Sequence, residues 1–238
     1  MPVLRGTVHA LDMPGTKTTA AVILTNDRWN AAMARVAVLP VRSEILPGEE
    51  RYAIAYGKGF VTAARVLSVF APPDPLSPLG PVVDGLEEDA LAAIEDRLCE
   101  FLELPNLLGD PPSVQRPAGE TSAYPLWGEI YRGPVLGNER KRFVVVSPNE
   151  WNRISGMASG VRTTTQLKID DIWFPRIVDG STRAACGDGT TFTTGEWRLA
   201  RRDRPTPFTT TIRDMVAIAR GLADVYDLGS ALTRLGIA

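Results

Sequence analysis

The chain has 238 residues, 44% of them apolar, and a formal net charge of −2. This length accommodates one large domain or two small ones. It contains no apolar run of 18 residues, and its N-terminus lacks a basic region followed by an apolar core. We therefore expect a cytoplasmic protein with no spanning helix, no secretory leader and no membrane partner.

The cysteines and the histidine restrict the chemistry. Cys99 and Cys186 have neither CxxC spacing nor a neighbouring histidine, so we expect free buried thiols, no metal and no cofactor. His9 is the only histidine, and its alternating surroundings are typical of a structural strand residue. Nucleophile systems that need a histidine base would have only His9 to use. Acid–base chemistry must otherwise come from Arg, Lys, Thr, Asp or Glu.

Charge is divided unevenly along the chain. Residues 1–110 carry 9 Lys and Arg against 15 Asp and Glu, whereas residues 111–238 carry 17 against 13. A nucleic-acid site is therefore more plausible on the second half, where the field favours phosphate. Simple drift of surface charge along the chain explains the same numbers equally well.

The first half reads as short strands followed by one helix. Strands are predicted, in chain order, at 6–11, 20–25, 35–41, 51–56 and 60–70, followed by a Pro-rich loop at 71–81. Apolar residues three and four apart then predict an amphipathic helix over 89–105. Residues 106–124 are rich in Pro and Gly and read as a linker.

The second half repeats this order. Strands are predicted at 128–133, 142–147, 159–167 and 171–177, and an amphipathic helix over 213–229. The stretches "AVILTNDRWN" (21–30) and "FVVVSPNEWN" (143–152) have similar sequences and lie 122 residues apart. The sequences of the two predicted helices match at an offset of 124 residues. This periodicity predicts two domains, 1–105 and 125–238, each a small β-barrel closed by a helix.

The order of motifs resembles the MazF/PemK toxin family. That family has a strand with Gly-Asp/Glu-Ile/Val-Tyr, then Arg-Pro-Val-Leu-Val-x-x-Asn-Asp, an apolar strand ending Pro-Ile-Thr-Ser, and a helix ending Leu-x-Leu. The first copy shows "RGTVHAL", "AAVILTND" and "VAVLPVRS", and the second shows "WGEIY", "RFVVVSPNEWNR" and "VRTTTQ". The resemblance covers residues 4–104 and 126–228.

The resemblance implies a fold that is mainly β with α: two tandem SH3-like barrels arranged as an intramolecular pseudo-dimer. It also implies a metal-independent endoribonuclease that cuts single-stranded RNA to 2′,3′-cyclic phosphate and 5′-hydroxyl ends. The implied partners are single-stranded RNA and an antitoxin or other protein, and further oligomerisation is compatible with this arrangement. The alternative is a catalytically inactive RNA- or protein-binding regulatory module, motivated by the degenerate first copy and by Phe143 where the family has Pro.

Only the second copy matches the family's catalytic residues. Arg142 falls at the Arg position and Thr164 at the Thr position, and both are predicted to be catalytic. In the first copy Thr19 or Ala20 stands where Arg belongs, and Arg42 stands where Thr belongs. A planar bidentate Arg stabilises the charge on a phosphorane-like transition state in a way that Thr or Ala cannot, so the first copy is expected to have lost cleavage.

Further side chains are predicted to bind RNA. They are Arg140, Lys141, Thr163, Thr165, Arg201, Arg202 and Arg204, the last three in the basic stretch "RLARRDRP". A solvated basic turn explains that stretch equally well. Four tryptophans of the second half could stack bases, although aromatic residues of a small barrel more often form its core.

Overall fold

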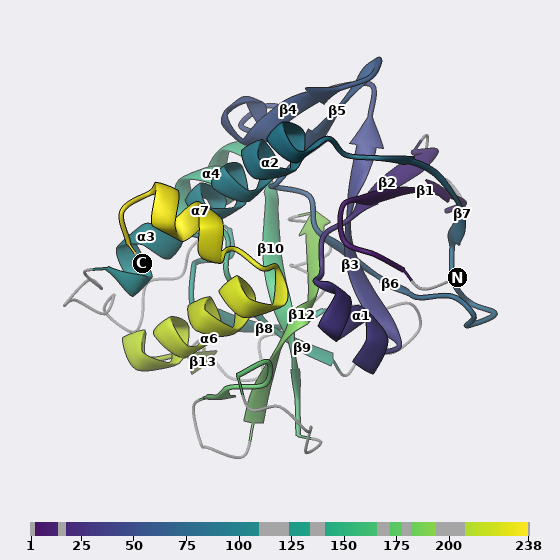
Figure 1. Ribbon diagram of the computed structural model, residues 1–238. Coiled ribbons are helices and arrows are strands. Elements are labelled where there is room, and N and C mark those ends of the chain that lie inside the picture. Colours follow the sequence, from purple (N-terminus) through teal and green to yellow (C-terminus); the bar gives the residue numbers. More distant parts are fainter. Residues whose placement is uncertain are drawn as a thin grey trace.

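The computed structural model describes residues 3–13, 18–109, 124–133, 141–165, 172–177, 182–193 and 208–237 (Figure 1). Within these residues the strands form two antiparallel sheets, one in each half of the chain. None of the described helices is long and apolar enough to cross a membrane.

The first sheet has the strand order β4-β5-β3-β2-β1-β7, and β6 also pairs with β3. Its strands are β1 (Thr7–Leu11), β2 (Ala20–Ile23), β3 (Arg35–Arg42), β4 (Ala53–Tyr56), β5 (Gly59–Thr62), β6 (Leu67–Phe70) and β7 (Leu79–Gly85). The helices of this half are α1 (Asp27–Ala32), the 3-10 turn η1 (Glu50–Tyr52), α2 (Glu88–Phe101) and α3 (Leu104–Leu108).

The second sheet has the order β11-β12-β10-β9-β8-β13. Its strands are β8 (Glu129–Gly133), β9 (Lys141–Val145), β10 (Met157–Thr164), β11 (Arg176–Ile177), β12 (Thr182–Thr193) and β13 (Phe208–Thr209). The helices are α4 (Asn149–Ser155), α6 (Ile212–Val225) and α7 (Gly229–Arg234).

Elements of the two halves match at the offsets seen in the sequence. The strands β1 and β3 and the helix α1 begin 122 residues before β8, β10 and α4, and α2 begins and ends 124 residues before α6. Gly6 and Gly128 share a left-handed φ of 75° and 78° just before the first strand of each half. Glu103 and Asp227, just after the long helices, share the unusual φ values of 53° and 51°.

The duplicated phrase forms the same hydrogen bonds twice. The Thr25 hydroxyl donates to Asn30 Oδ1 over 2.5 Å, and the Ser147 hydroxyl donates to Asn152 Oδ1 over 2.5 Å. Each asparagine also donates from its Nδ2 to the main-chain carbonyl of the same Thr or Ser. These bonds tie the end of a strand to the following short helix, which explains why Asn follows Trp in both copies.

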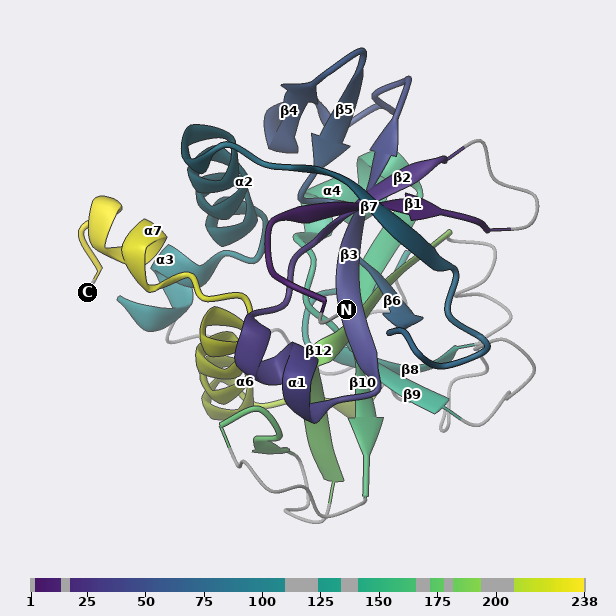
Figure 2. The ribbon, with the colours of Figure 1, turned by 45° about the vertical axis from the view of Figure 1, so that its right-hand side comes forward.

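The two halves share one core. A continuous apolar cluster includes buried residues of both sheets and of α2 and α6. Within it Trp29 of α1 packs edge-on against Trp173 at 5.3 Å, and Phe101 of α2 packs edge-on against Trp151 of α4 at 5.1 Å. Figures 1 and 2 show α2, α3, α6 and α7 together on one side of the molecule, away from β7.

Some sequence predictions need correction. The residues after "VILT" and "VVVS", for which no helix was predicted, form a helix in each half, and in the first half Asn26 caps it by accepting from the amide of Trp29. The strand predicted at 60–70 is two strands, β5 and β6, and the loop predicted at 71–81 contains the start of β7. The linker predicted at 106–124 begins inside α3.

Candidate nucleic-acid groove

A groove lies between the two halves. Its larger basin has a volume of about 560 Å³, and residues lining it include Arg35, Leu67 and Phe70 of the first half and Phe143, Arg162 and Phe192 of the second. A smaller basin of about 350 Å³ lies on the first half, lined by residues that include Pro40, Arg42, Ser43 and Arg65. Leu67 and Thr191 line both basins, and we call the whole the interdomain groove.

A buried carboxylate joins two arginines in the larger basin. Asp188 is only 5% exposed, and its Oδ1 lies 3.4 Å from Arg35 Nε while its Oδ2 lies 2.5 Å from Arg162 Nε. Arg35 comes from β3 of the first half and also stacks over the ring of Phe70, 4.6 Å from its centroid. The cluster therefore connects the halves, and one carboxylate offsets part of the basin's positive charge.

The smaller basin contains a second buried ion pair. Arg65 Nε contacts Glu49 Oε1, and the Glu49 side chain is fully buried. Burial lowers the pKa of Arg65 from its ordinary value, whereas the hydrogen bond and charge of Glu49 raise it. Arg65 is therefore held by Glu49, and the other cation of this basin, Arg42, is half-buried.

The register of β9 and β10 separates the two predicted catalytic residues. Arg162 pairs with Phe143 and Val161 pairs with Val144. Because successive side chains of a strand point to opposite faces, Thr164 shares the face of Arg162 and Phe143, whereas Arg142 points to the opposite face. The register therefore puts the side chains of Arg142 and Thr164 on opposite faces of the sheet, and their catalytic roles stay predictions.

The same register places Lys141 across from Thr164. If the pairing of Phe143 with Arg162 is continued by two residues along each antiparallel strand, Lys141 stands opposite Thr164. Both side chains are half-buried, and the neighbouring pair on their face lines the groove. A cation and a hydroxyl thus adjoin the larger basin on the second half.

The first half carries the same two kinds of side chain on exchanged strands. Ala21 pairs with Pro40, and continuing this register places Thr19 opposite Arg42. Here the cation is on the later strand and the threonine on the earlier one, the reverse of the second half. In the first half, the cation and the threonine have therefore exchanged strands, in addition to the loss of the family's catalytic residues that the sequence indicates.

Other predicted residues are placed as follows. Thr163 is buried on the face of Arg142, and Thr165 is exposed after the end of β10. Arg140, Arg201, Arg202 and Arg204 lie outside the described residues. The expected RNA track along the basic stretch stays a prediction.

The histidine, the two cysteines and two of the tryptophans lie in the interior, as expected for residues with a structural role. His9 is 5% exposed in β1 with Nδ1 2.9 Å from the carbonyl of Gly80, and both cysteines are free and buried. Trp151 and Trp173 are core residues, each 3% exposed. Within the described parts of the chain, no group of three or more His, Cys, Asp or Glu side chains is arranged to hold a metal ion.

Sequence reasoning missed the Arg35–Asp188–Arg162 cluster. Asp188 lies in "CGDG", which has no strand periodicity, and Arg35 is more than 150 residues away along the chain. Only the packing of β12 beside β3 and β6 brings them together. Alternation along the predicted strand puts Lys141 on the face of Phe143, which the sequence could show, whereas the pairing of Phe143 with Arg162 comes from the structure.

Comparison with known proteins gives structural neighbours only. No protein-family model matches the chain, and no curated protein matches it. A mycobacterial endoribonuclease in complex with its cognate antitoxin is similar over 42% of this chain and 91% of its own, with 18% identity and a TM-score of 0.34. Deinococcus radiodurans MazE–MazF (Form-I) is similar over 46% and 97%, with 20% identity and a TM-score of 0.33. Form-III of the same complex gives 48% and 99%, 17% identity and 0.32. The two Deinococcus radiodurans complexes contain MazF, which gives its name to the family that the sequence resembles.

Proposed function

We propose that this protein is a metal-independent endoribonuclease that cuts single-stranded RNA in the interdomain groove, with the chemistry in the second half. The halves act as a single-chain pseudo-dimer of two MazF-like barrels. The observation that supports the proposal is the pairing of Phe143 with Arg162 on the face that lines the groove, because this register, continued by two residues, places Lys141 opposite Thr164. The matching elements and duplicated hydrogen bonds of the two halves support the pseudo-dimer.

In the proposed reaction the ribose 2′ oxygen attacks the adjacent phosphorus. The 2′ oxygen loses its proton as the new bond forms, and the 5′ oxygen gains one as the old bond breaks. The products are a 2′,3′-cyclic phosphate and a 5′-hydroxyl. The Lys141 ammonium stabilises the negative charge that develops on the non-bridging oxygens, and the Thr164 hydroxyl donates a hydrogen bond to the same group.

Two adjacent residues provide a matched test. Purified protein is incubated with long single-stranded RNA in EDTA, and new 5′-hydroxyl ends are mapped. Lys141→Met is expected to lower the cleavage rate by about 10²–10³-fold, the usual effect of removing one group that stabilises transition-state charge. Arg142→Met, on the opposite face, is expected to cleave close to the wild-type rate.

The outcomes separate three cases. A large loss in Arg142→Met with little loss in Lys141→Met would favour the assignment made from the sequence. Equal product patterns in the wild type, Lys141→Met and Thr164→Val would reject the nuclease. RNA binding is measured in parallel, so that a loss of affinity is not mistaken for a loss of chemistry.

One observation favours a second function, a binding module without catalysis. Three half-buried arginines of the groove are already paired with the chain's own carboxylates, Arg35 and Arg162 with Asp188 and Arg65 with Glu49. Such pairs leave less net charge to attract phosphate. Recovery of one stoichiometric protein partner, in a preparation that does not cleave RNA, would support this alternative.

A further inference from the structure

The guanidinium of Arg162 is only partly used by the protein itself. Arg162 lies on β10 and lines the larger basin of the interdomain groove, and its buried Nε forms the ion pair with Asp188 Oδ2. Its two Nη nitrogens make no hydrogen bond or ion pair with any residue that the structure describes, and both are accessible to solvent. The Nη edge of Arg162 is therefore available to a ligand in the basin.

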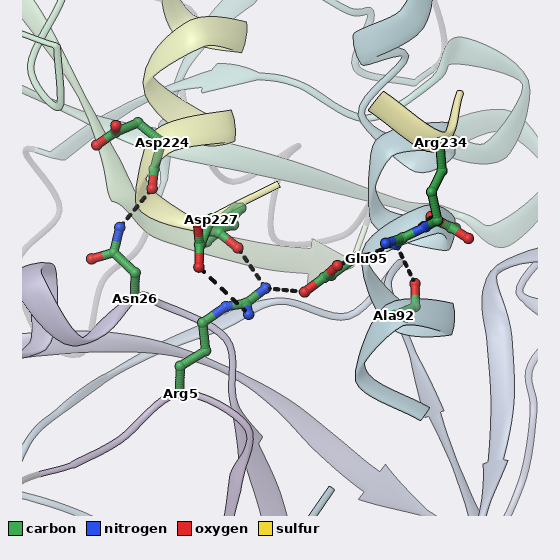
Figure 3. Close-up of polar contacts among 9 residues, drawn as sticks. Arg5, Asn26, Ala92, Glu95, Asp224, Asp227 and Arg234 are labelled. Atoms are coloured by element: carbon green, nitrogen blue, oxygen red, sulfur yellow. Dashed lines mark hydrogen bonds and ion pairs between the residues drawn. The ribbon is translucent and has the colours of Figure 1, made fainter. Parts of the chain in front are cut away.

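A structural arginine of the same chain uses its Nη nitrogens differently. Figure 3 shows Arg5 pointing between Glu95 and Asp227. Its Nη2 donates to Glu95 Oε1 over 2.7 Å, and its Nη1 lies 4.0 Å from Asp227 Oδ2. Arg5 thus joins parts of the fold through the outer end of its guanidinium. Arg162 is held at Nε alone, which leaves that outer end for recognition.

The ion pair with Asp188 determines which donors a ligand can meet. A guanidinium offers parallel N–H donors either from Nε and one Nη or from its two Nη nitrogens. Because Asp188 contacts Nε, the pair formed by the two Nη nitrogens is the one that remains. Asp188 is only 5% exposed and also lies 3.4 Å from Arg35 Nε, so the anchor is itself held in place. Two fixed parallel donors suit a ligand with two adjacent acceptors.

The walls of the basin are mostly apolar. The half-buried ring of Phe192 packs edge-on against Phe143 at 5.1 Å, and Leu76 is 72% exposed. Such walls offer stacking and apolar contact to the flat ring of a nucleobase. A phosphate group would gain nothing from them. The apolar residues that line the basin include Met13, Leu67, Phe70, Leu76, Phe143 and Phe192.

Of the four RNA bases, guanine fits this combination best. Its O6 and N7 are adjacent acceptors, and arginine bound to both is the commonest specific contact between proteins and DNA bases. Adenine has a donor beside N7, and uracil has its N3–H donor between two carbonyl oxygens. Cytosine has adjacent acceptors at O2 and N3, but its single ring covers less of the apolar walls. A basin of about 560 Å³ has room for the two rings of guanine.

We propose that the larger basin binds one unpaired guanine of the RNA and that Arg162 is the residue that selects it. This inference rests on the proposed function, because it names a base of the RNA that the groove would cut. The two Nη nitrogens of Arg162 donate to guanine O6 and N7, and the ring packs against Phe192 and Leu76. Thr164 lies two residues further along the same face of β10, about 7 Å away. The guanine therefore belongs to a nucleotide next to the phosphate that is cut.

The test compares RNAs that differ in one base and that no nuclease of this type can cut. They are pentanucleotides of sequence U-U-X-U-U with fluorine in place of every 2′-hydroxyl, where X is guanine, 7-deazaguanine, adenine or cytosine. Fluorescence anisotropy at one fixed salt concentration measures their affinity for the full chain. Guanine is expected to bind about tenfold more tightly than adenine. It is expected to bind about fivefold more tightly than 7-deazaguanine, which keeps O6 and lacks the N7 acceptor.

A variant and its matched control assign the preference to Arg162. Arg162→Lys keeps a positive charge beside Asp188 and removes the two parallel donors. It is expected to bind the guanine, 7-deazaguanine and adenine RNAs within about twofold of one another. Arg220→Lys makes the same change at an exposed position of α6, on the helical side, and is expected to keep the preference for guanine. The comparison of bases on the unsubstituted protein stands even where a variant fails to fold.

Several outcomes would overturn the proposal. They are equal affinity for guanine and 7-deazaguanine, cytosine bound as tightly as guanine, and a preference that Arg162→Lys keeps or that both variants lose. A guanine preference in binding, without cleavage of long RNA, would reject the nuclease and leave the guanine site standing. Cleavage of long RNA with no guanine next to the mapped 5′-hydroxyl ends would reject the guanine site and leave the nuclease standing.

Discussion

The two halves differ at equivalent positions in the residues that we propose to act on RNA. Continued by two residues, the strand registers place Lys141 opposite Thr164 in the second half and Thr19 opposite Arg42 in the first, with the two kinds of side chain on exchanged strands. Exchange matters because an attacking 2′ oxygen and a leaving 5′ oxygen lie on opposite sides of the phosphorus. When the cation and the hydroxyl exchange places, each therefore lies on the other side of the bound phosphate, and the pair does not stabilise the reaction equally.

This asymmetry predicts that the first half can be converted. Thr19→Lys with Arg42→Thr, made in a Thr164→Ala background, is expected to restore cleavage that Thr164→Ala alone has lost. The physical reason is that the two changes recreate the order of the second half on an equivalent strand pair. Mapping of 5′-hydroxyl ends measures the restoration. Unrestored cleavage, with RNA binding intact, would show that the two faces are not interchangeable.

The duplicated asparagines are expected to differ in their contribution to stability. Asn152 is fully buried and donates to the carbonyl of Pro125 over 2.9 Å in addition to its bonds with Ser147, whereas Asn30 is only half-buried. Truncation of either asparagine leaves its hydrogen-bond partners unsatisfied. Each such group costs about 1–3 kcal/mol of folding stability where it is fully desolvated.

Asn152→Ala should therefore lower the free energy of unfolding by about 2–3 kcal/mol, and Asn30→Ala by about 1 kcal/mol. Urea denaturation at 25 °C measures both, and similar midpoints for the two variants would contradict the argument from burial.

At the scale of elements, the sequence predicted the helices and strands whose apolar residues recur with the period of one buried face. The helices α2 and α6 were predicted because their apolar residues recur three and four apart on one buried stripe. The edge strand β7 was missed because residues 81–85 are exposed and include Pro81, which an edge strand tolerates. The strand β12 was missed because Gly187 and Gly189 interrupt it. A Cβ at Gly187 would lie 2.3 Å from the Trp29 ring, so packing against the other half requires glycine there.

The residues of the candidate site also include some that the sequence can place and some that it cannot. The faces of its residues on β9 and β10 can be read from the alternation along each strand, whereas the register between the two strands comes from the structure. Its buried ion pairs could not be predicted, because Arg35 and Asp188 meet only when one half packs on the other. Pairings between halves depend on packing across an interface that no sequence period encodes.

The two long helices differ in how they begin. Thr211 accepts from the amide of Asp214, whose carboxylate accepts from the amide of Thr211, so α6 has a complete capping box. Glu87 at the equivalent end of α2 makes no side-chain cap bond. Thr211→Ala is expected to lower the free energy of unfolding by about 1 kcal/mol, and Glu87→Ala by less. Thermal and urea unfolding of both variants measure this, and a larger loss at Glu87 would contradict it.

At the scale of the whole molecule, the halves are joined by more than the chain that connects them. The apolar cluster is continuous between them, with Trp29 stacked on Phe174 and Phe101 against Trp151. The pair of Arg35 with Asp188 adds a buried charge contact across the same boundary. Separating the halves would expose these groups to water, which the hydrophobic effect opposes.

Cleavage of the connecting chain is therefore expected to leave the halves associated. A protease site inserted within residues 112–120 and cut to completion should yield two fragments that elute together in size-exclusion chromatography at micromolar concentration. Asp188→Asn should weaken that association, because it leaves Arg35 and Arg162 without their shared counter-charge, at a cost of about 3 kcal/mol. Asp227→Asn, at a 71% exposed side chain, serves as the charge-matched control and should leave the fragments together. Fragments that separate in the unsubstituted protein would show that the shared core is too weak to replace the covalent connection, and the single-chain pseudo-dimer would then depend on the linker.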